Sequence, residues 1–259
     1  NGCRLVENPL RRVDCAGGFS YDIDFDDLEA KASQPDNRML ILCNPHNPTG
    51  RVWTHDELSR IASICRRHDV IVVSDEIHCE LTMPGYAYTP YATVDSSAIV
   101  CCSPSKAFNI AGLQIANIVV PDEATYMRVD KAININEVCD VNPFGVAALM
   151  AAYNHGGEWL DSLKRYLYDN WCCLRDFFGL RFPELSLCQL QSTYLAWIDI
   201  SSLGIGADEL EHRLLETAHV WVNSGVMYGR DGFIRINFAC PRQRLIDGLE
   251  RIARALSTM

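Results

Sequence analysis

The chain has 259 residues, of which 48% are hydrophobic and 22% are charged, and its formal net charge is −10. This composition is typical of a folded globular protein with one large or two modest domains. The acidic balance and the lack of a basic stripe argue against a nucleic-acid partner, and no apolar run is long enough to span a bilayer. We therefore expect a cytoplasmic protein with no nucleic-acid or membrane partner.

The twelve cysteines are scattered along the chain. The close pairs, Cys101–Cys102 and Cys172–Cys173, are adjacent residues, and no Cys-x-x-Cys or Cys/His spacing typical of zinc occurs. We expect these residues to act as small hydrophobic side chains in a reducing compartment, and no metal site is predicted.

Four short apolar runs in the first half of the chain predict buried strands, at residues 39–43, 70–73, 98–102 and 115–120. Strands that are apolar on both faces and alternate with a helix are typical of a mostly parallel sheet covered on both sides. The sequence therefore predicts an α/β fold for this part of the chain.

A helix is predicted between the first two of these strands. Thr54 to Glu57 has the form of a capping box, in which the two side chains bind the free backbone N–H groups of the first turn. The apolar residues that follow lie on one helical face and are Leu58, Ile61, Ala62 and Cys65.

The pattern changes from about Asn142. Helices are predicted at residues 143–153 and 158–178, and then come a strand at 194–200, a helix at 207–217, a strand at 233–238 and a last helix from Pro241. This order predicts a smaller α+β domain behind a long connecting helix. We place the boundary near residue 175, so that residues 1–175 form the large domain with the connecting helix and residues 176–259 the small domain.

Polar clusters follow three of the predicted parallel strands. They are Asn44–Gly50, Ser74–His78 and Ser103–Gln114. In open α/β sheets, ligands bind at the edge formed by the carboxyl ends of the strands. The architecture therefore predicts that all three clusters lie in one place.

Together these clusters resemble the aminotransferase class I/II superfamily, whose members are pyridoxal 5′-phosphate (PLP) enzymes of fold type I. Within this superfamily, the motifs are most similar to those of the MalY/PatB-type cystathionine β-lyases, also called C–S lyases. The resemblance runs almost from end to end, through Asn142–Gly145, Thr193–Trp197 and Ile234–Arg242. The order and spacing of these motifs carry it, since any one of them alone is modest evidence.

The resemblance implies a role for several residues around the cofactor. Lys106 matches the Schiff-base lysine, whose amine also moves the Cα proton of the substrate. Asp75 matches the carboxylate that keeps the pyridine nitrogen protonated, and Asn47 matches the asparagine that hydrogen-bonds the phenolate oxygen. The alternatives are a solvated surface lysine, a helix N-cap and an ordinary turn residue, respectively.

Further positions match less closely. His78 stands where many relatives have a tyrosine that contacts the phenolate oxygen, and a structural histidine is an equal alternative. Ser103 and Ser105 match phosphate-binding hydroxyls, although serines near a strand end are often only loop residues. Eight residues beyond the lysine, where many aminotransferases have an arginine, this chain has Gln114, in agreement with the C–S lyase subgroup.

The substrate-binding residue implied by the resemblance is Arg235, which matches the arginine that holds the α-carboxylate in a bidentate fork. A surface arginine is the alternative. Tyr194 and Trp197 also resemble family positions, and we expect them to belong to the core.

The resemblance also implies that relatives have an N-terminal segment ahead of the position of Asn1, with a phosphate-binding loop and an aromatic ring over the cofactor. We therefore expect an N-terminally incomplete large domain, from a split, cleaved or truncated protein. A sheet without its early elements would expose apolar surface. Relatives are homodimers, so self-association is expected as well.

The expected function is PLP-dependent β-elimination from an amino acid with a sulfur leaving group, such as cystathionine or a cysteine S-conjugate, which gives a thiol, pyruvate and ammonia. An aminotransferase would use the same residues and is the first alternative. A non-catalytic fragment kept for interaction or regulation is the second.

Overall fold

The structure is a computed structural model that describes residues 2–138 and 140–257. Its first sheet has the strand order β3-β4-β5-β6. These strands are β3 (Met39–Cys43), β4 (Ile71–Asp75), β5 (Ile99–Cys102) and β6 (Asn117–Val119). β3, β4 and β5 are parallel, which confirms the mostly parallel sheet, but β6 is shorter than predicted and pairs antiparallel with β5.

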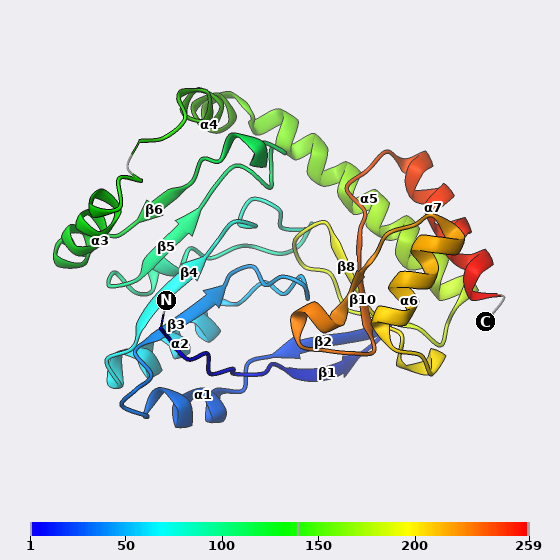
Figure 1. The fold of residues 1–259 in the computed structure, drawn as a ribbon, viewed down its shortest axis with the longest axis horizontal. Coiled ribbons are helices and arrows are strands. Elements are labelled where there is room, and N and C mark those ends of the chain that lie inside the picture. The colour runs from blue at the N-terminus through cyan, green and yellow to red at the C-terminus, as the bar shows by residue number, and fades with distance from the viewer. Residues whose placement is uncertain (1, 139, 258–259) are drawn as a thin grey trace.

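Two helices cover one face of this sheet, α1 (Phe25–Ala32) and α2 (His55–Arg67) (Figure 1). The predicted capping box begins α2: Thr54 Oγ1 accepts from Glu57 N at 3.2 Å, and the Glu57 carboxylate accepts from Thr54 N at 2.7 Å. The apolar face of α2 packs against the sheet through buried residues that include Leu42 and Val72. Since helix formation alone stabilises little, this packing holds the helix in place.

The other face of the sheet is open at its edges. Met39 and Ile41 on β3 and Ile118 on β6 are exposed, because alternate side chains of a strand point to opposite faces. The prediction that the sheet is covered on both sides is therefore wrong for these strands within the described residues.

A hairpin that the sequence analysis missed opens the chain, with β1 (Arg11–Cys15) paired antiparallel to β2 (Gly18–Asp22). Gly17 and Gly18 have φ values of +81° and +154° at the turn, which glycine adopts without the steric cost of a Cβ. Phe19 packs with Trp197 and Phe233, so the hairpin lies against the C-terminal sheet. The domain boundary near residue 175 stays a prediction.

The C-terminal sheet is antiparallel, with the order β7-β8-β10-β9. Its strands are β7 (Ser186–Leu187), β8 (Leu195–Asp199), β9 (Asn223–Ser224) and β10 (Phe233–Asn237), and its helices are α6 (Ala207–Arg213), continued by a π-helical turn at Leu214–Ala218, and α7 (Arg242–Leu256). This arrangement confirms the α+β character of the C-terminal part.

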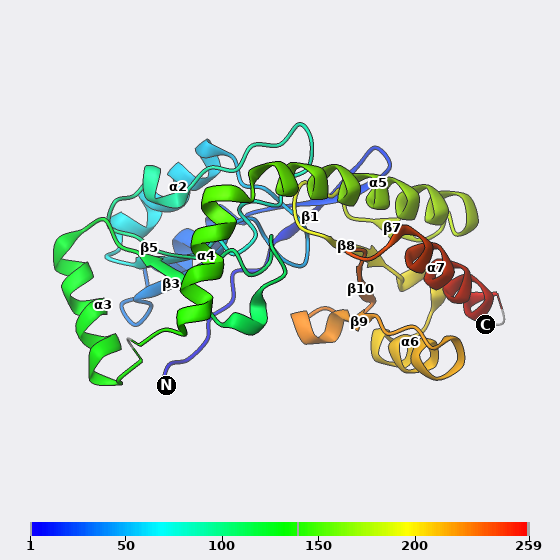
Figure 2. The ribbon, with the colours of Figure 1, turned by 90° about the horizontal axis from the view of Figure 1, so that it is seen from above.

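The long helix α5 (Gly157–Arg181) runs from the first sheet to this second unit (Figures 1 and 2). Its buried residues Leu167, Leu174 and Phe178 belong to the same core as α7 and β8. Asn170, fully buried, donates from Nδ2 to the carbonyl oxygens of Phe238 and Cys240, both at 2.9 Å, and accepts from Arg242 Nε at 2.6 Å. These bonds fix the segment that follows β10 to the helix.

Two helices, α3 (Glu123–Ile135) and α4 (Pro143–His155), lie at the far end of the first sheet (Figure 2). α4 is apolar over most of its surface, yet Gly145 is its one fully buried residue in the described part of the chain. Short 3₁₀ turns complete the fold at Tyr91–Thr93, Ala111–Leu113, Ser201–Leu203 and Gly225–Tyr228. Within the described ranges, no helix is long and apolar enough to cross a membrane.

Candidate active site

The carboxyl ends of β3, β4 and β5 are joined to one another by backbone hydrogen bonds beyond the strands. Asn44 N donates to Asp75 O at 2.9 Å, and Glu76 N donates to Cys101 O at 2.8 Å. The three polar clusters therefore begin side by side at one edge of the sheet, where parallel strands place their ligand-binding residues.

Lys106 and Asp75 both lie at this edge. Lys106 is partly buried in the turn after β5, and its Nζ has no hydrogen-bond partner among residues 2–138 and 140–257. Asp75 is the last residue of β4, is exposed, and accepts from Ile77 N at 3.2 Å. A free amine and an exposed carboxylate thus follow neighbouring strands, and their roles toward a cofactor stay predictions.

Asn47 lies in the loop that follows β3. Its backbone N–H donates to Cys43 Sγ at 3.4 Å, and its side-chain Oδ1 accepts from Arg235 Nη1 at 3.1 Å. Gly50 closes the loop with φ +70°, and a Cβ there would lie 2.9 Å from both Leu190 Cδ1 and Ser192 O. The loop is therefore held against the C-terminal unit, and glycine is required where they touch.

Arg235 brings the second unit into the site from β10. Besides Asn47, its guanidinium donates from Nη2 to Asn223 Oδ1 at 2.7 Å, and it lies 4.9 Å from the ring centroid of Tyr228. Its buried Nε has no hydrogen-bond partner in the described structure. Since buried donors are almost always paired, this N–H is available to a bound anion.

His78 is only 3% exposed, and its Nδ1 also has no partner among the described residues. Its ring meets the Tyr194 ring edge-on, with 6.0 Å between centroids. Burial, with the nearby charges of Lys106 and Arg235, lowers the pKa of His78 to about 4. The imidazole is therefore neutral near pH 7 and offers one donor or acceptor to a bound group.

The two predicted phosphate-binding serines differ in what their side chains already bind. Ser103 Oγ donates its single proton to Ile115 O at 2.6 Å and accepts from Ser105 N at 3.1 Å. Ser105 is almost buried, and its hydroxyl makes no hydrogen bond to a described residue. Ser103 thus shapes the turn itself, and its role toward a phosphate stays a prediction. Gln114 is exposed in a left-handed conformation.

Of the two family positions that we expected in the core, Trp197 is confirmed there, because it is buried and stacks on Phe233. Tyr194 is partly buried, packs against the main core and also borders His78. The sequence analysis also missed Asn223 and Tyr228, whose only signal is that they precede the strand that carries Arg235.

Glu76 is a third residue that the sequence analysis missed. It is 1% exposed, and its carboxylate accepts from Ser74 Oγ at 2.9 Å, Tyr91 N at 2.9 Å, Asn44 Nδ2 at 3.3 Å and the Tyr88 hydroxyl. Side chains alternate along a strand, so Asp75 points outward and Glu76 inward. Glu76 thereby ties the segments after β3 and β4 to residues 88–91.

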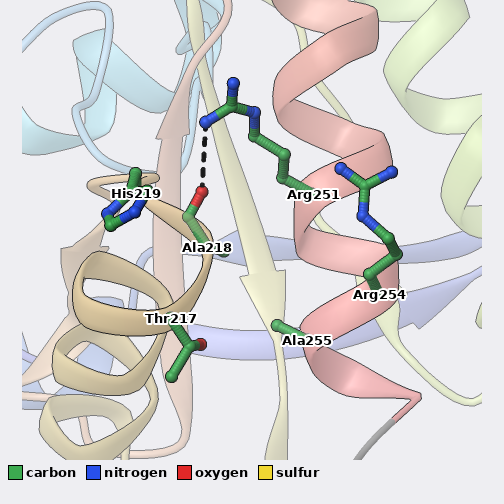
Figure 3. A pocket seen from close by; sticks show the side chains of 6 residues that line it. All are labelled: Thr217, Ala218, His219, Arg251, Arg254 and Ala255. Carbon is green, nitrogen blue, oxygen red and sulfur yellow. Dashed lines mark hydrogen bonds between the residues drawn. The ribbon is translucent and has the colours of Figure 1, made fainter.

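A hollow of about 390 Å³ lies on the C-terminal unit, between the π-helical turn and α7 (Figure 3). It is lined by Thr217, Ala218, His219, Arg251, Arg254 and Ala255. Arg251 donates to Ala218 O at 3.5 Å across it. None of the predicted site residues lines this hollow in the described part of the chain, so we assign it no part in the site.

The residues at the sheet edge fit a pyridoxal phosphate site on the structure alone. Within the described residues, the buried atoms Asn44 Oδ1, His78 Nδ1 and Arg235 Nε have no hydrogen-bond partner, and neither has the Lys106 amine. Such groups are costly to bury unless a ligand completes them. A ligand with polar and charged groups, bound between the edge of an α/β sheet and a second unit, would complete them.

Comparisons with known proteins agree with such a site. The family model for aminotransferase class I and II matches residues 1–252, and the chain belongs to that family. It is 40% identical to cystathionine beta-lyase PatB of Bacillus subtilis over 263 residues, which cover 99% of this chain and 67% of PatB.

Solved structures give the same result. The PLP-bound C-S lyase from Staphylococcus hominis has a TM-score of 0.87 and 36% identity, covering 97% of this chain and 64% of that one. Cystalysin from Treponema denticola, which contains a pyridoxal 5′-phosphate cofactor, has a TM-score of 0.90 and 34% identity, covering 95% and 64%. The chain thus spans about two thirds of the length of the proteins it matches.

Replacing Glu76 by alanine should lower the free energy of unfolding by about 3 kcal/mol, because the donors of Ser74, Tyr91, Asn44 and Tyr88 lose a buried acceptor. Glu76→Gln keeps one carbonyl oxygen and should cost less. Urea denaturation measures both. Glu7→Ala, at an exposed glutamate, is the control and should change the value by no more than about 0.5 kcal/mol. Equal effects at the two positions would contradict the role of the buried carboxylate.

The lowered pKa of His78 predicts a pH-dependent stability. At pH values between the usual pKa of about 6.5 and the folded pKa of about 4, His78 is protonated in the unfolded chain but neutral in the native state. The free energy of unfolding therefore falls as the pH falls through this range. His78→Gln removes this titration. From pH 7 to pH 5 the wild type should lose about 2 kcal/mol more than the variant in urea denaturation. Parallel losses would show that His78 is not kept neutral by folding.

Proposed function

We propose that this protein is a PLP-dependent carbon–sulfur β-lyase that acts on cystathionine or a cysteine S-conjugate. The observation that carries the choice of reaction is the 40% identity to cystathionine beta-lyase PatB across 99% of the chain. The sheet edge supports it with an unpaired amine at Lys106, an exposed carboxylate at Asp75 and the guanidinium of Arg235.

In this proposal Arg235 binds the α-carboxylate of the substrate. Its guanidinium forms no ion pair with a carboxylate of the described residues, and its Nε is unpaired, so a bidentate bond to an anion is open to it. The substrate amine and Cβ substituent then extend toward Lys106 and His78. The positive charges of Lys106 and Arg235 both lower the pKa of His78, so both lie near its ring.

The cofactor would be held by Lys106, Asp75, Asn47, His78, Ser103 and Ser105. When bound, it supplies an aldehyde that takes up the amino group and a ring that withdraws electrons from Cα. Asp75 holds a proton on the ring nitrogen, since a carboxylate stabilises the charged form of a neighbouring base. Asn47 and the neutral His78 orient the ring oxygen through hydrogen bonds.

Lys106 then removes the Cα proton of the substrate, and its free amine is the base suited to this step. The Cβ–S bond breaks, the thiolate leaves and is protonated, and water releases the remaining three carbons as pyruvate with ammonia. Because no second keto acid takes part, the reaction differs from transamination in its stoichiometry.

We also propose that the protein works in the cytoplasm. Cys65 and Cys188 are buried free thiols, and burial raises the pKa of the Cys65 thiol to about 11 and that of Cys188 to about 12. Such protonated thiols are unreactive packing groups, as is usual in a reducing compartment.

Incubating the chain with PLP and L-cystathionine, without any keto acid, should yield pyruvate and a free thiol in equal amounts. Lys106→Ala should lower the rate by about a hundredfold or more, because the base is lost. Lactate dehydrogenase coupling measures pyruvate, and Ellman's reagent measures the thiol. Lys131→Ala, an exposed lysine on α3, is the matched control and should keep the wild-type rate.

Two results would contradict the proposal. Turnover that requires an added keto acid would assign the chain to the aminotransferases. A folded chain that retains the cofactor absorbance after gel filtration but forms no pyruvate would indicate a non-catalytic role.

We further propose that the protein is a homodimer, with α4 in the interface. Phe144 is 74% exposed on this helix, and Met150 and Tyr153 are exposed as well. A helix that is apolar all round is normally buried, and contiguous apolar patches on monomers are rare. A second copy of the chain is the occupant that the family resemblance supports.

Light scattering during gel filtration should give twice the chain mass of 29.1 kDa. Phe144→Asp should shift the protein toward the monomer, since a charge in an apolar interface is unpaired. Leu180→Asp makes the same change at a residue of α5 that is 82% exposed, and it should leave the mass unchanged. A monomeric wild type would refute the proposal.

A further inference from the structure

Arg235 is surrounded by neutral groups. Its two terminal nitrogens donate to the side-chain oxygens of Asn47 and Asn223, and its flat face lies over the ring of Tyr228. Within the described residues no carboxylate forms an ion pair with it. A guanidinium has five N–H donors, so these two bonds leave three donors free, among them the buried Nε.

An acidic side chain beside this strand pair, Glu211, is directed elsewhere. Glu211 of α6 accepts from Ser224 N at 3.0 Å and from Trp221 Nε1 at 2.7 Å. Its carboxylate is therefore hydrogen-bonded to the backbone of β9 and to the indole. Asn223, the neighbour of Ser224 in the chain, is the residue that bonds Arg235. Its amide oxygen accepts a hydrogen bond without cancelling the positive charge.

The position of Asn223 is fixed by the sheet. Asn223 and Arg235 are direct partners in the antiparallel β9–β10 register, and the next pair is Ser224 with Ile234. Cross-strand partners have their Cβ atoms only about 5 Å apart, so the amide lies beside the arginine side chain from its base. The 2.7 Å bond at Nη2 then fixes the rotation of the guanidinium about its own axis.

We infer that Asn223 is a positioning residue that orients Arg235 and leaves its charge uncompensated for a substrate carboxylate. The inference rests on the carboxylate-binding role proposed for Arg235 and names the residue that gives it specificity for an anion. Asn47 provides the equivalent bond from the other unit. An aspartate at position 223 would have nearly the same shape as asparagine. Its carboxylate would form an ion pair with Arg235 in place of a bound anion.

Binding of 3-(methylthio)propanoate tests this directly, because this acid has the carboxylate and sulfur of S-methylcysteine but no amine, and thus needs no reaction. Isothermal titration of the full chain should show that Asn223→Asp weakens its binding by about tenfold or more, since the new carboxylate competes for the guanidinium. Asn223→Ala should weaken it by about threefold, because the charge remains but its orientation is lost.

The methyl ester of the same acid is the ligand control. It has no charge, so Asn223→Asp should change its affinity by less than about twofold. Asn134→Asp is the variant control: it adds the same charge on exposed α3 and should leave the binding of the acid unchanged. The thermal midpoints of all variants show that each is folded.

Four outcomes judge the inference. A wild type that binds the acid no better than the ester, or an Asn223→Asp variant that binds the acid as tightly as the wild type, overturns it. Equal losses for acid and ester show a merely structural role and overturn it as well. If the wild type binds the acid selectively and Asn223→Asp loses this binding, but the wild type releases no thiol from L-cystathionine, the proposed lyase function fails while the role of Asn223 stands.

Discussion

The hydrogen bond between Arg235 and Asn47 joins the two units of the molecule at the point where the site lies. Asn47 belongs to the loop after β3, whereas Arg235 lies on β10 of the other sheet, 188 residues later in the sequence. Its geometry depends on both surroundings: Gly50 allows the loop to approach residues 190–192, and Asn223 fixes the guanidinium from its own sheet. A shift of either unit would therefore change the distance between the Arg235 guanidinium and the sheet edge that carries Lys106.

The electrostatic character of the site depends on a buried neutral group, His78, near the positive charges of Lys106 and Arg235. His78 is neutral because charging it would require solvation that the interior does not provide, and Lys106 and Arg235 oppose that charge further. The buried carboxylate of Glu76 is instead satisfied by hydrogen bonds from Ser74, Asn44, Tyr88 and Tyr91. Neither the Lys106 amine nor the Arg235 guanidinium forms an ion pair with a carboxylate of the described residues, so both can meet an anionic ligand even though the protein as a whole is acidic.

Helix α4 and the outer strands β3 and β6 expose apolar side chains. Phe144, Ile41 and Ile118 are exposed in a chain that spans about two thirds of the length of its relatives. Hydrophobic surface of this extent is stable when another protein surface covers it. The proposed association through α4 is linked to the site, since α4 leads directly into α5, which packs against the unit that carries Arg235.

The sequence by itself determined the parallel core β3–β5, the capped helix α2 and the placement of Lys106, Asp75 and Asn47 at the carboxyl edge, because periodicity, capping and strand polarity are local properties. The sequence did not predict the hairpin β1–β2 or the antiparallel pairing of β6. The residues of a strand do not determine which strand it pairs with. Asn223, Tyr228 and Glu76 were decided by the tertiary structure alone. Their importance comes from what they touch: a guanidinium across a strand pair, and donors up to thirty-two residues away. Sequence spacing carries no record of such contacts, because only the packed chain brings them within hydrogen-bond reach.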